Sequence, residues 1–142
     1  MKALRSLVLV GSATAFAAAL AGCSVVDTVI WGNDGAQVIQ TTENLIHDLA
    51  SEGTSDLLCE DFAADLGSAG DWAGRPAGEP ERFVADYWED QVPLDPQWNI
   101  NVEGLPEGAV PGDEFPGDIF YRETDQGLCV IDVVWSTLVS VG

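Results

Sequence analysis

Positive charge is scarce in this 142-residue chain. It has five lysine and arginine residues against 24 aspartate and glutamate residues, which gives a formal net charge of −19. Proteins that bind nucleic acid contact the phosphates mainly through lysine and arginine. We therefore exclude nucleic acid as a partner. An anionic lipid surface would also repel this chain.

The common catalytic and metal-binding patterns are missing as well. There is no Gly-x-Ser-x-Gly motif, no phosphate loop and no zinc-type spacing of cysteine and histidine. The one histidine, His47, falls on the polar side of a predicted helix together with Glu43, an ordinary surface pair. We predict no catalytic residue, no metal and no cofactor. A pair of carboxylates could still perform acid–base chemistry, so enzymatic activity stays open.

Long apolar runs are confined to the N-terminus. Lys2 and Arg5 precede an apolar stretch at residues 6–19, and small residues follow it. This is the order of a bacterial export signal. Crossing a bilayer as a helix takes ~20 apolar residues, and this stretch is shorter and contains Gly11 and Thr14.

The four residues that follow, Leu20-Ala21-Gly22-Cys23, resemble the lipobox of bacterial lipoproteins. The resemblance implies recognition of Leu20, Ala21 and Gly22 by the signal peptidase, and removal of residues 1–22. Cys23 would then carry a diacylglyceryl group, with palmitate as a typical acyl chain, and hold the protein on the outer face of the cell membrane. Two alternatives are plain secretion after an Ala-x-Ala site and a disulfide at Cys23. Without its signal, the chain keeps three arginines and no lysine, a net charge of −21.

Two other cysteines, Cys59 and Cys129, remain after Cys23 is set aside. Exported proteins meet an oxidising environment, and two thiols have only one intramolecular pairing. We predict a Cys59–Cys129 disulfide, with two buried free thiols as the alternative. Both cysteines fall on apolar faces of predicted elements, so the bond would clamp a helix onto a sheet.

Three helices are predicted in the first part of the mature chain. The first begins near Asp34, a good N-cap, and ends at Gly53. A second covers about 55–66, with Cys59 on its apolar side, and a third begins at Pro80. Residues 23–35 are predicted to be a lipidated tether, and residues 36–142 a single acidic domain.

Strands are predicted in the last part. Trp98, Ile100 and Val102 alternate with polar residues, and further strands are predicted at 119–123 and 128–139. A hairpin turn at residues 124–127 joins the last two, with Gly127 supplying positive φ. We expect an α+β domain in which three helices pack on one face of an antiparallel sheet of three or more strands.

A second resemblance concerns the mature domain. A helix, an Ala-Ser-Glu-Gly link, a Cys-bearing helix (DLASEGTSDLLCEDFAADL) and a Cys in a strand ending in Trp (GLCVIDVVW) are similar to small actinobacterial lipoproteins with a cystatin- or NTF2-like roll. Such a roll often leaves a pocket between its helices and its sheet. The residues that could line it here are Tyr87, Trp88, Trp98 and Trp135.

Three functions remain compatible with the sequence. The leading hypothesis is a lipid-anchored, extracytoplasmic binding or accessory protein without catalytic activity, whose ligand or protein partner is not specified. A small pocket-type enzyme on the roll is the second. The third is a low-affinity binder of calcium or of a basic partner, because acidic loops occur near Asp95 and Asp113. The loop at Asp95 lacks the glycine and glutamate of an EF-hand.

Overall fold

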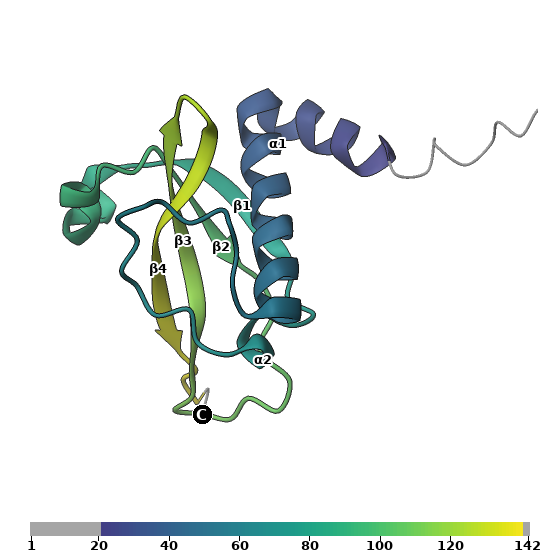
Figure 1. The fold of residues 1–142 in the computed structure, drawn as a ribbon. Helices are drawn as coiled ribbons and strands as arrows, with labels where there is room; N and C mark the ends of the chain where they lie inside the picture. The colour runs from purple at the N-terminus through teal and green to yellow at the C-terminus, as the bar shows by residue number, and fades with distance from the viewer. Residues whose placement is uncertain (1–20, 141–142) are drawn as a thin grey trace, which may run out of the picture.

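A kinked helix and a four-stranded sheet make up most of the domain (Figure 1). The computed structural model describes residues 21–140. Residues 1–20 of the predicted signal, Leu20 included, lie outside these residues, as do the side chains of Ala21, Gly22 and Cys23. The α+β class is confirmed, but the predicted set of three N-terminal helices is wrong.

Helix α1 spans Ala21–Glu52 and is broken at Gly32, where φ is 74° and ψ is 176°. Residues other than glycine rarely adopt this combination of backbone angles. After the break, apolar residues recur three and four positions apart, and they are buried against the sheet: Val38, Ile39, Leu45, Ile46 and Leu49. The predicted helix is thus confirmed. It also extends further toward the N-terminus than expected, into the segment that we read as a tether.

The sheet is an antiparallel meander in the order β1-β2-β3-β4. Its strands are β1 (Ala77–Arg82), β2 (Trp98–Val102), β3 (Glu114–Thr124) and β4 (Gly127–Thr137). The alternation in β2 and the hairpin between β3 and β4 agree with the sequence prediction. Strand β3 begins at Glu114, whereas the predicted strand began at residue 119.

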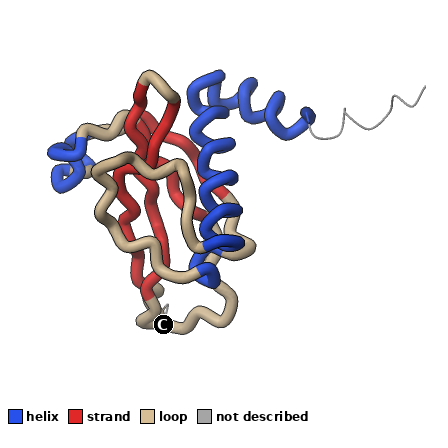
Figure 2. The backbone as a smooth tube through the Cα atoms, in the orientation of Figure 1, coloured by secondary structure: helices blue, strands red, loops and turns tan. Residues whose placement is uncertain are grey.

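The helix predicted over residues 55–66 does not form. Figure 2 shows this part of the chain as a loop that follows α1 and passes over the sheet. Its apolar side chains still pack against the core, and its backbone pairs with the edge strand β4 through Leu58 and Val130. An edge strand offers unpaired N–H and C=O groups. Tertiary contacts of this kind override a moderate helix propensity. The only other α-helix in the described residues is the short α2 (Ala69–Trp72).

The helix predicted to begin at Pro80 is also absent. Pro80 lies in β1, an edge strand, where a residue without an N–H is tolerated. The chain then forms two 3₁₀ helices, η1 (Ala85–Tyr87) and η2 (Glu89–Leu94). Phe83, Trp88 and Leu94 pack on the face of the sheet opposite α1, whereas Val84 and Tyr87 are exposed.

The sheet therefore has an apolar layer on each face. The larger core lies between α1, the loop that follows it and the sheet, and it includes the fully buried Trp72 and Tyr121. The smaller cluster contains Cys59, Phe120 and Ile131, with Phe83, Trp88 and Leu94 packed against it. Both layers stabilise the hairpin of β3 and β4 beside the disulfide.

Candidate functional site

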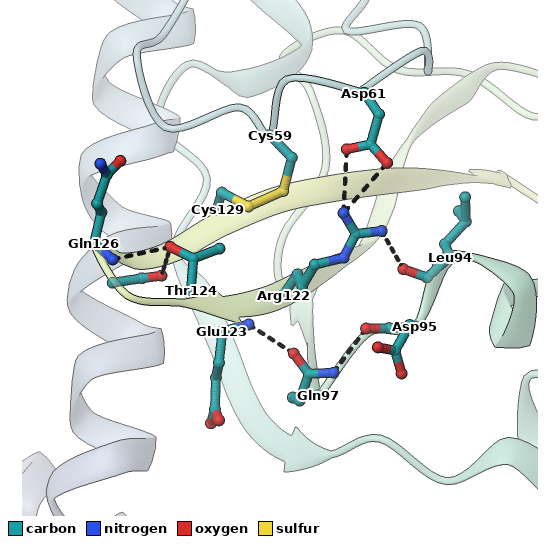
Figure 3. The surroundings of a disulfide bond; sticks show 11 residues. Cys59, Asp61, Leu94, Asp95, Gln97, Arg122, Glu123, Thr124, Gln126 and Cys129 are labelled. Atoms are coloured by element: carbon teal, nitrogen blue, oxygen red, sulfur yellow. Dashed lines mark hydrogen bonds and ion pairs between the residues drawn. A yellow bond between two sulfur atoms is a disulfide. The ribbon is translucent and has the colours of Figure 1, made fainter.

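The disulfide between Cys59 and Cys129 lies at the hairpin end of the sheet (Figure 3). It joins residues 70 positions apart, with Cα atoms separated by 4.9 Å. Two backbone hydrogen bonds bring the loop alongside β4: the Cys59 N–H donates to Val130 O (2.9 Å), and the Val130 N–H donates to Leu57 O (2.8 Å). The predicted pairing is confirmed, but the bond holds a loop, rather than a helix, on the sheet.

Cys129 lies on the face of the sheet opposite α1, whereas a bond that clamps a helix onto the sheet would have placed it on the helix-covered face. A β-bulge interrupts the pairing of β3 and β4 between Phe120 and Tyr121, with Ile131 as the additional residue on β4. A bulge changes the face on which the following side chains point. Cys129 therefore packs with Phe120 in the smaller cluster, and Val133 packs in the larger one.

Arg122 is the central polar residue of this region. It pairs with Cys129 across the hairpin, and its Nη1 donates to both carboxylate oxygens of Asp61 at 3.1 and 3.2 Å. Its Nη2 donates to the carbonyl oxygen of Leu94. Only 27 % of its side chain is exposed. One guanidinium thus ties together the hairpin, the disulfide loop and the end of η2 (Figure 3).

A hollow of about 400 Å³ lies beside this arginine. Its walls are Leu58, Cys59, Glu60, Asp61, Arg122, Thr124, Asp125, Gln126 and Cys129. Three of these residues are acidic and one is basic, so the hollow carries net negative charge.

Several bonds hold the walls of the hollow in place. Thr124 Oγ1 donates to Gly127 O and accepts from the Gln126 N–H, which fixes the turn. Gln97 Oε1 accepts from the Glu123 N–H, which fixes the adjoining part of β3. Glu60 and Asp125 are exposed on the rim. The walls of the hollow are therefore held in place by hydrogen bonds, and two of its acidic side chains are exposed.

Arg82 lies on the other side of the hairpin and is also neutralised internally. Its guanidinium bonds to Asp34 at 3.0 Å and to Glu123 at 3.1 Å, and it lies over the ring of Trp98 at 4.0 Å. These contacts join α1, β1 and β3. The positive charge of Arg82 is therefore neutralised by acidic side chains of the same domain.

The third arginine, Arg75, is buried. Its side chain donates to three carbonyl oxygens, those of Asp71, Val102 and Gly104, and its guanidinium lies 5.2 Å from the ring centre of Phe115. Burial lowers its pKa, and the charge of Asp71 partly opposes this effect. Every arginine in residues 21–140 is therefore engaged within the domain.

The carboxylates are placed very differently from the arginines. All 24 lie within the described residues, and only Asp34, Asp61 and Glu123 form ion pairs there. Asp118, on the face of the sheet opposite α1, has its pKa raised by burial and then by the charge of Glu81. Most of the remaining acids are exposed, so the outer surface is strongly anionic.

The four aromatic residues expected around a pocket do not surround one cavity. Tyr87 is 79 % exposed on η1. Trp88 packs edge-on against Phe120, with ring centres 4.9 Å apart, in the smaller cluster. Trp98 and Trp135 belong to the larger core on the other face.

Other candidate residues are also dispersed. His47 is exposed on α1, away from the hairpin. Asp95 ends η2 in a left-handed conformation, and Asp113 bonds to the backbone N–H of Val110. Within the described part of the chain, no group of three or more histidine, cysteine, aspartate or glutamate side chains is arranged to hold a metal ion. No helix there is long and apolar enough to cross a membrane.

The hollow itself was missed by the sequence analysis, although one signal for it was available. A turn at residues 124–127 pairs residue 122 with residue 129, so the predicted hairpin already implied that Arg122 lies opposite Cys129. The proposed disulfide would then have brought Asp61 close to Arg122. A comparison with known proteins adds no functional assignment: no family model matches this chain, and no curated protein or solved structure matches it either.

Proposed function

We propose that this chain is a lipid-anchored protein of the outer face of the cell membrane, and that its acidic domain binds a basic partner without catalysing a reaction. Its attachment point is Cys23. The apolar stretch at residues 6–19 and the lipobox resemblance of Leu20-Ala21-Gly22-Cys23 support this location. The disulfide supports it too, because such bonds persist in oxidising compartments.

The distribution of charge carries the proposal of a basic partner. The three arginines are engaged inside the domain, while only three of 24 carboxylates are in ion pairs. A surface of one sign produces a long-range field that attracts ligands of the opposite sign and speeds their association. The same surface is repelled by anionic lipid of the membrane. The acyl chains on Cys23 would therefore hold the domain at the membrane against electrostatic repulsion.

The hollow beside Arg122 is the place where we expect the strongest contact. Its carboxylates at Glu60 and Asp125 are exposed, and the disulfide and the Arg122–Asp61 ion pair hold the walls between them. A preformed site loses less conformational entropy when it binds. A lysine or arginine side chain of the partner has a suitable size and charge for this space.

The roll-type architecture and the other two functions are less strongly supported. One long helix on a four-stranded antiparallel meander is consistent with the cystatin- or NTF2-like lipoproteins that the sequence resembles. The aromatic residues proposed for an enzyme pocket lie on both faces of the sheet. No contact among the described residues favours the calcium alternative over a basic partner.

Binding can be tested with two labelled peptides of equal length, one rich in lysine and one rich in glutamate. We expect fluorescence anisotropy to show binding of the lysine peptide only, and the affinity to fall as salt is added, because added ions screen the charges. Failure of the lysine peptide to bind at low salt would overturn the proposed basic partner.

Two double variants test whether the lysine-rich peptide binds at the hollow. The double substitution Glu60→Gln and Asp125→Asn removes two charges at the hollow. The control, Glu103→Gln with Glu107→Gln, removes two charges from the β2–β3 loop at the other end of the sheet (Figure 1). We expect the first pair to weaken binding severalfold more than the second. Equal weakening would show that the hollow is not the contact.

A further inference from the structure

The part of α1 before Gly32, residues 21–31, is here called the N-terminal arm. The non-helical φ and ψ of Gly32 redirect the chain, and the arm points away from the sheet and from the rest of α1 (Figure 1). Its base is fixed: Trp31 packs against the larger core and rests directly on Gly35, where a Cβ would lie 2.7 Å from the Cβ of Trp31. The arm is thus a helical projection with a defined direction.

An apolar stripe runs along the arm. Val25, Val26, Val29 and Ile30 are between 55 % and 80 % exposed. Positions 25 and 29, and positions 26 and 30, are each four residues apart, so the four side chains share one side of the helix. Other exposed large apolar side chains of the described residues are scattered over loops and the two 3₁₀ helices. A stripe of this kind indicates an interaction surface.

The other side of the arm is polar and is turned toward the rest of α1. Asp27 and Thr28 line a hollow of about 300 Å³ together with Asn33, Gln37 and other polar residues after the break. The kink therefore turns the polar side toward the rest of α1 and leaves the apolar stripe facing outward. Such a division is typical of helices that lie in the membrane interface.

Charge and length also distinguish the arm from the rest of the chain. Asp27 is its only acidic or basic residue, whereas the other 23 carboxylates follow Gly32. Eleven helical residues measure about 16 Å, too short to cross a hydrocarbon core of ~30 Å. The arm has the dimensions to lie along a bilayer surface, and the charged domain stays outside.

We infer that the N-terminal arm lies in the headgroup region of the bilayer, with Val25, Val26, Val29 and Ile30 directed toward the acyl chains. This inference rests on the proposed lipid at Cys23, two residues before Val25. The lipid would hold the arm at the surface, and the stripe would set its orientation. A second copy of the chain fits the stripe less well, because its approach would bring two domains of charge −21 together.

The experiment measures the depth of labels on the arm. The full protein is extracted from membranes, reconstituted into phosphatidylcholine vesicles and labelled with a fluorophore at Val29→Cys or, in a matched variant, at Asp27→Cys. Phospholipids that carry a nitroxide near the headgroup end of the acyl chain quench nearby labels. Asp27 is closer to Cys23 along the chain, so tethering alone would quench the label at position 27 at least as strongly.

We expect severalfold stronger quenching at position 29 than at position 27. Adding Val25→Ser and Ile30→Ser to the position-29 variant should remove most of this difference. Protein that floats with the vesicles but shows equal quenching at both positions would overturn the arm's placement and leave the anchor intact. Protein that does not float would overturn the anchor and the arm together. Efficient crosslinking between position-29 cysteines at high lipid-to-protein ratio would instead identify a second copy as the occupant and overturn the inference.

Discussion

The hydroxyl of Tyr121 on β3 lies 2.7 Å from Oγ1 of Thr42 on α1, and both residues are fully buried. Thr42 donates its own proton to the carbonyl oxygen of Val38 at 2.8 Å. Tyr121 is therefore the donor in the bond between them. Burial raises the pKa of Tyr121, and the hydrogen bond to Thr42 partly opposes this effect. This bond fixes α1 on the sheet at the centre of the larger core.

Removing one partner of this hydrogen bond should destabilise the domain. We expect Thr42→Val to lower the free energy of unfolding by about 1–3 kcal/mol, because the buried hydroxyl of Tyr121 loses its acceptor. Tyr121→Phe should cost less, about 1 kcal/mol, because Thr42 keeps its bond to Val38. Urea unfolding of both variants and of the double variant gives the coupling energy. If the losses in free energy of unfolding of the two single variants simply add in the double variant, a direct hydrogen bond between Thr42 and Tyr121 is contradicted.

Loss of the disulfide should have a larger effect. A bond across 70 residues restricts the unfolded chain and, in the chain-entropy model, contributes about 4 kcal/mol. Domains of this size have total stabilities of about 5–15 kcal/mol. We expect reductant, or Cys59→Ala with Cys129→Ala, to lower the urea midpoint strongly. The double variant itself should not respond to reductant, and an unchanged midpoint in reduced wild-type protein would contradict the account.

Asp118 should make the domain less stable as pH rises. Burial and Glu81 raise its pKa above the ordinary 3.8, so the folded state holds its proton at pH values where the unfolded state has lost it. This contribution to stability is therefore greatest below the ordinary pKa and declines as pH rises through the folded-state pKa. Asp118→Asn should raise the urea midpoint at pH 7 and have little effect near pH 3. The exposed Asp125→Asn is the control, and a lower midpoint for Asp118→Asn at pH 7 would refute this reading.

Salt should stabilise the domain. The Debye length shortens from ~30 Å at 0.01 M to ~10 Å at 0.1 M ionic strength, and the repulsion among the many unpaired carboxylates decreases with it. We expect the melting temperature to rise over this range of sodium chloride, with a neutral solute of equal osmolality as the control. A fall in the melting temperature would contradict this expectation. It would mean that salt weakens the ion pairs of Arg82 and Arg122 by more than it relieves the repulsion.

The elements that sequence analysis predicted correctly have local causes. The alternation of Trp98, Ile100 and Val102 and the turn before Gly127 depend on neighbouring residues alone. The helical spacing after Asp34 is likewise a local pattern, and it packs on the sheet as expected.

The failures have non-local causes. The apolar residues around Cys59 and after Pro80 have spacing that fits a helix, but the edge of β4 and the cluster at Phe120 compete for those side chains. The bulge at Ile131, which moves Cys129 to the other face, has no sequence signal that we could recognise. The ion pair of Asp61 and Arg122 joins residues 61 positions apart and depends on the hairpin register and the disulfide together.

Attachment at Cys23 underlies both the proposed function and the position of the arm, and the intact mass of the protein extracted from membranes tests it most directly. The account predicts a chain that begins at Cys23 and carries the mass of a diacylglyceryl group, with or without a third acyl chain. Alkylation should add mass at Cys59 and Cys129 only after reduction. A chain that retains residues before Cys23, or that begins there without lipid, would contradict the account.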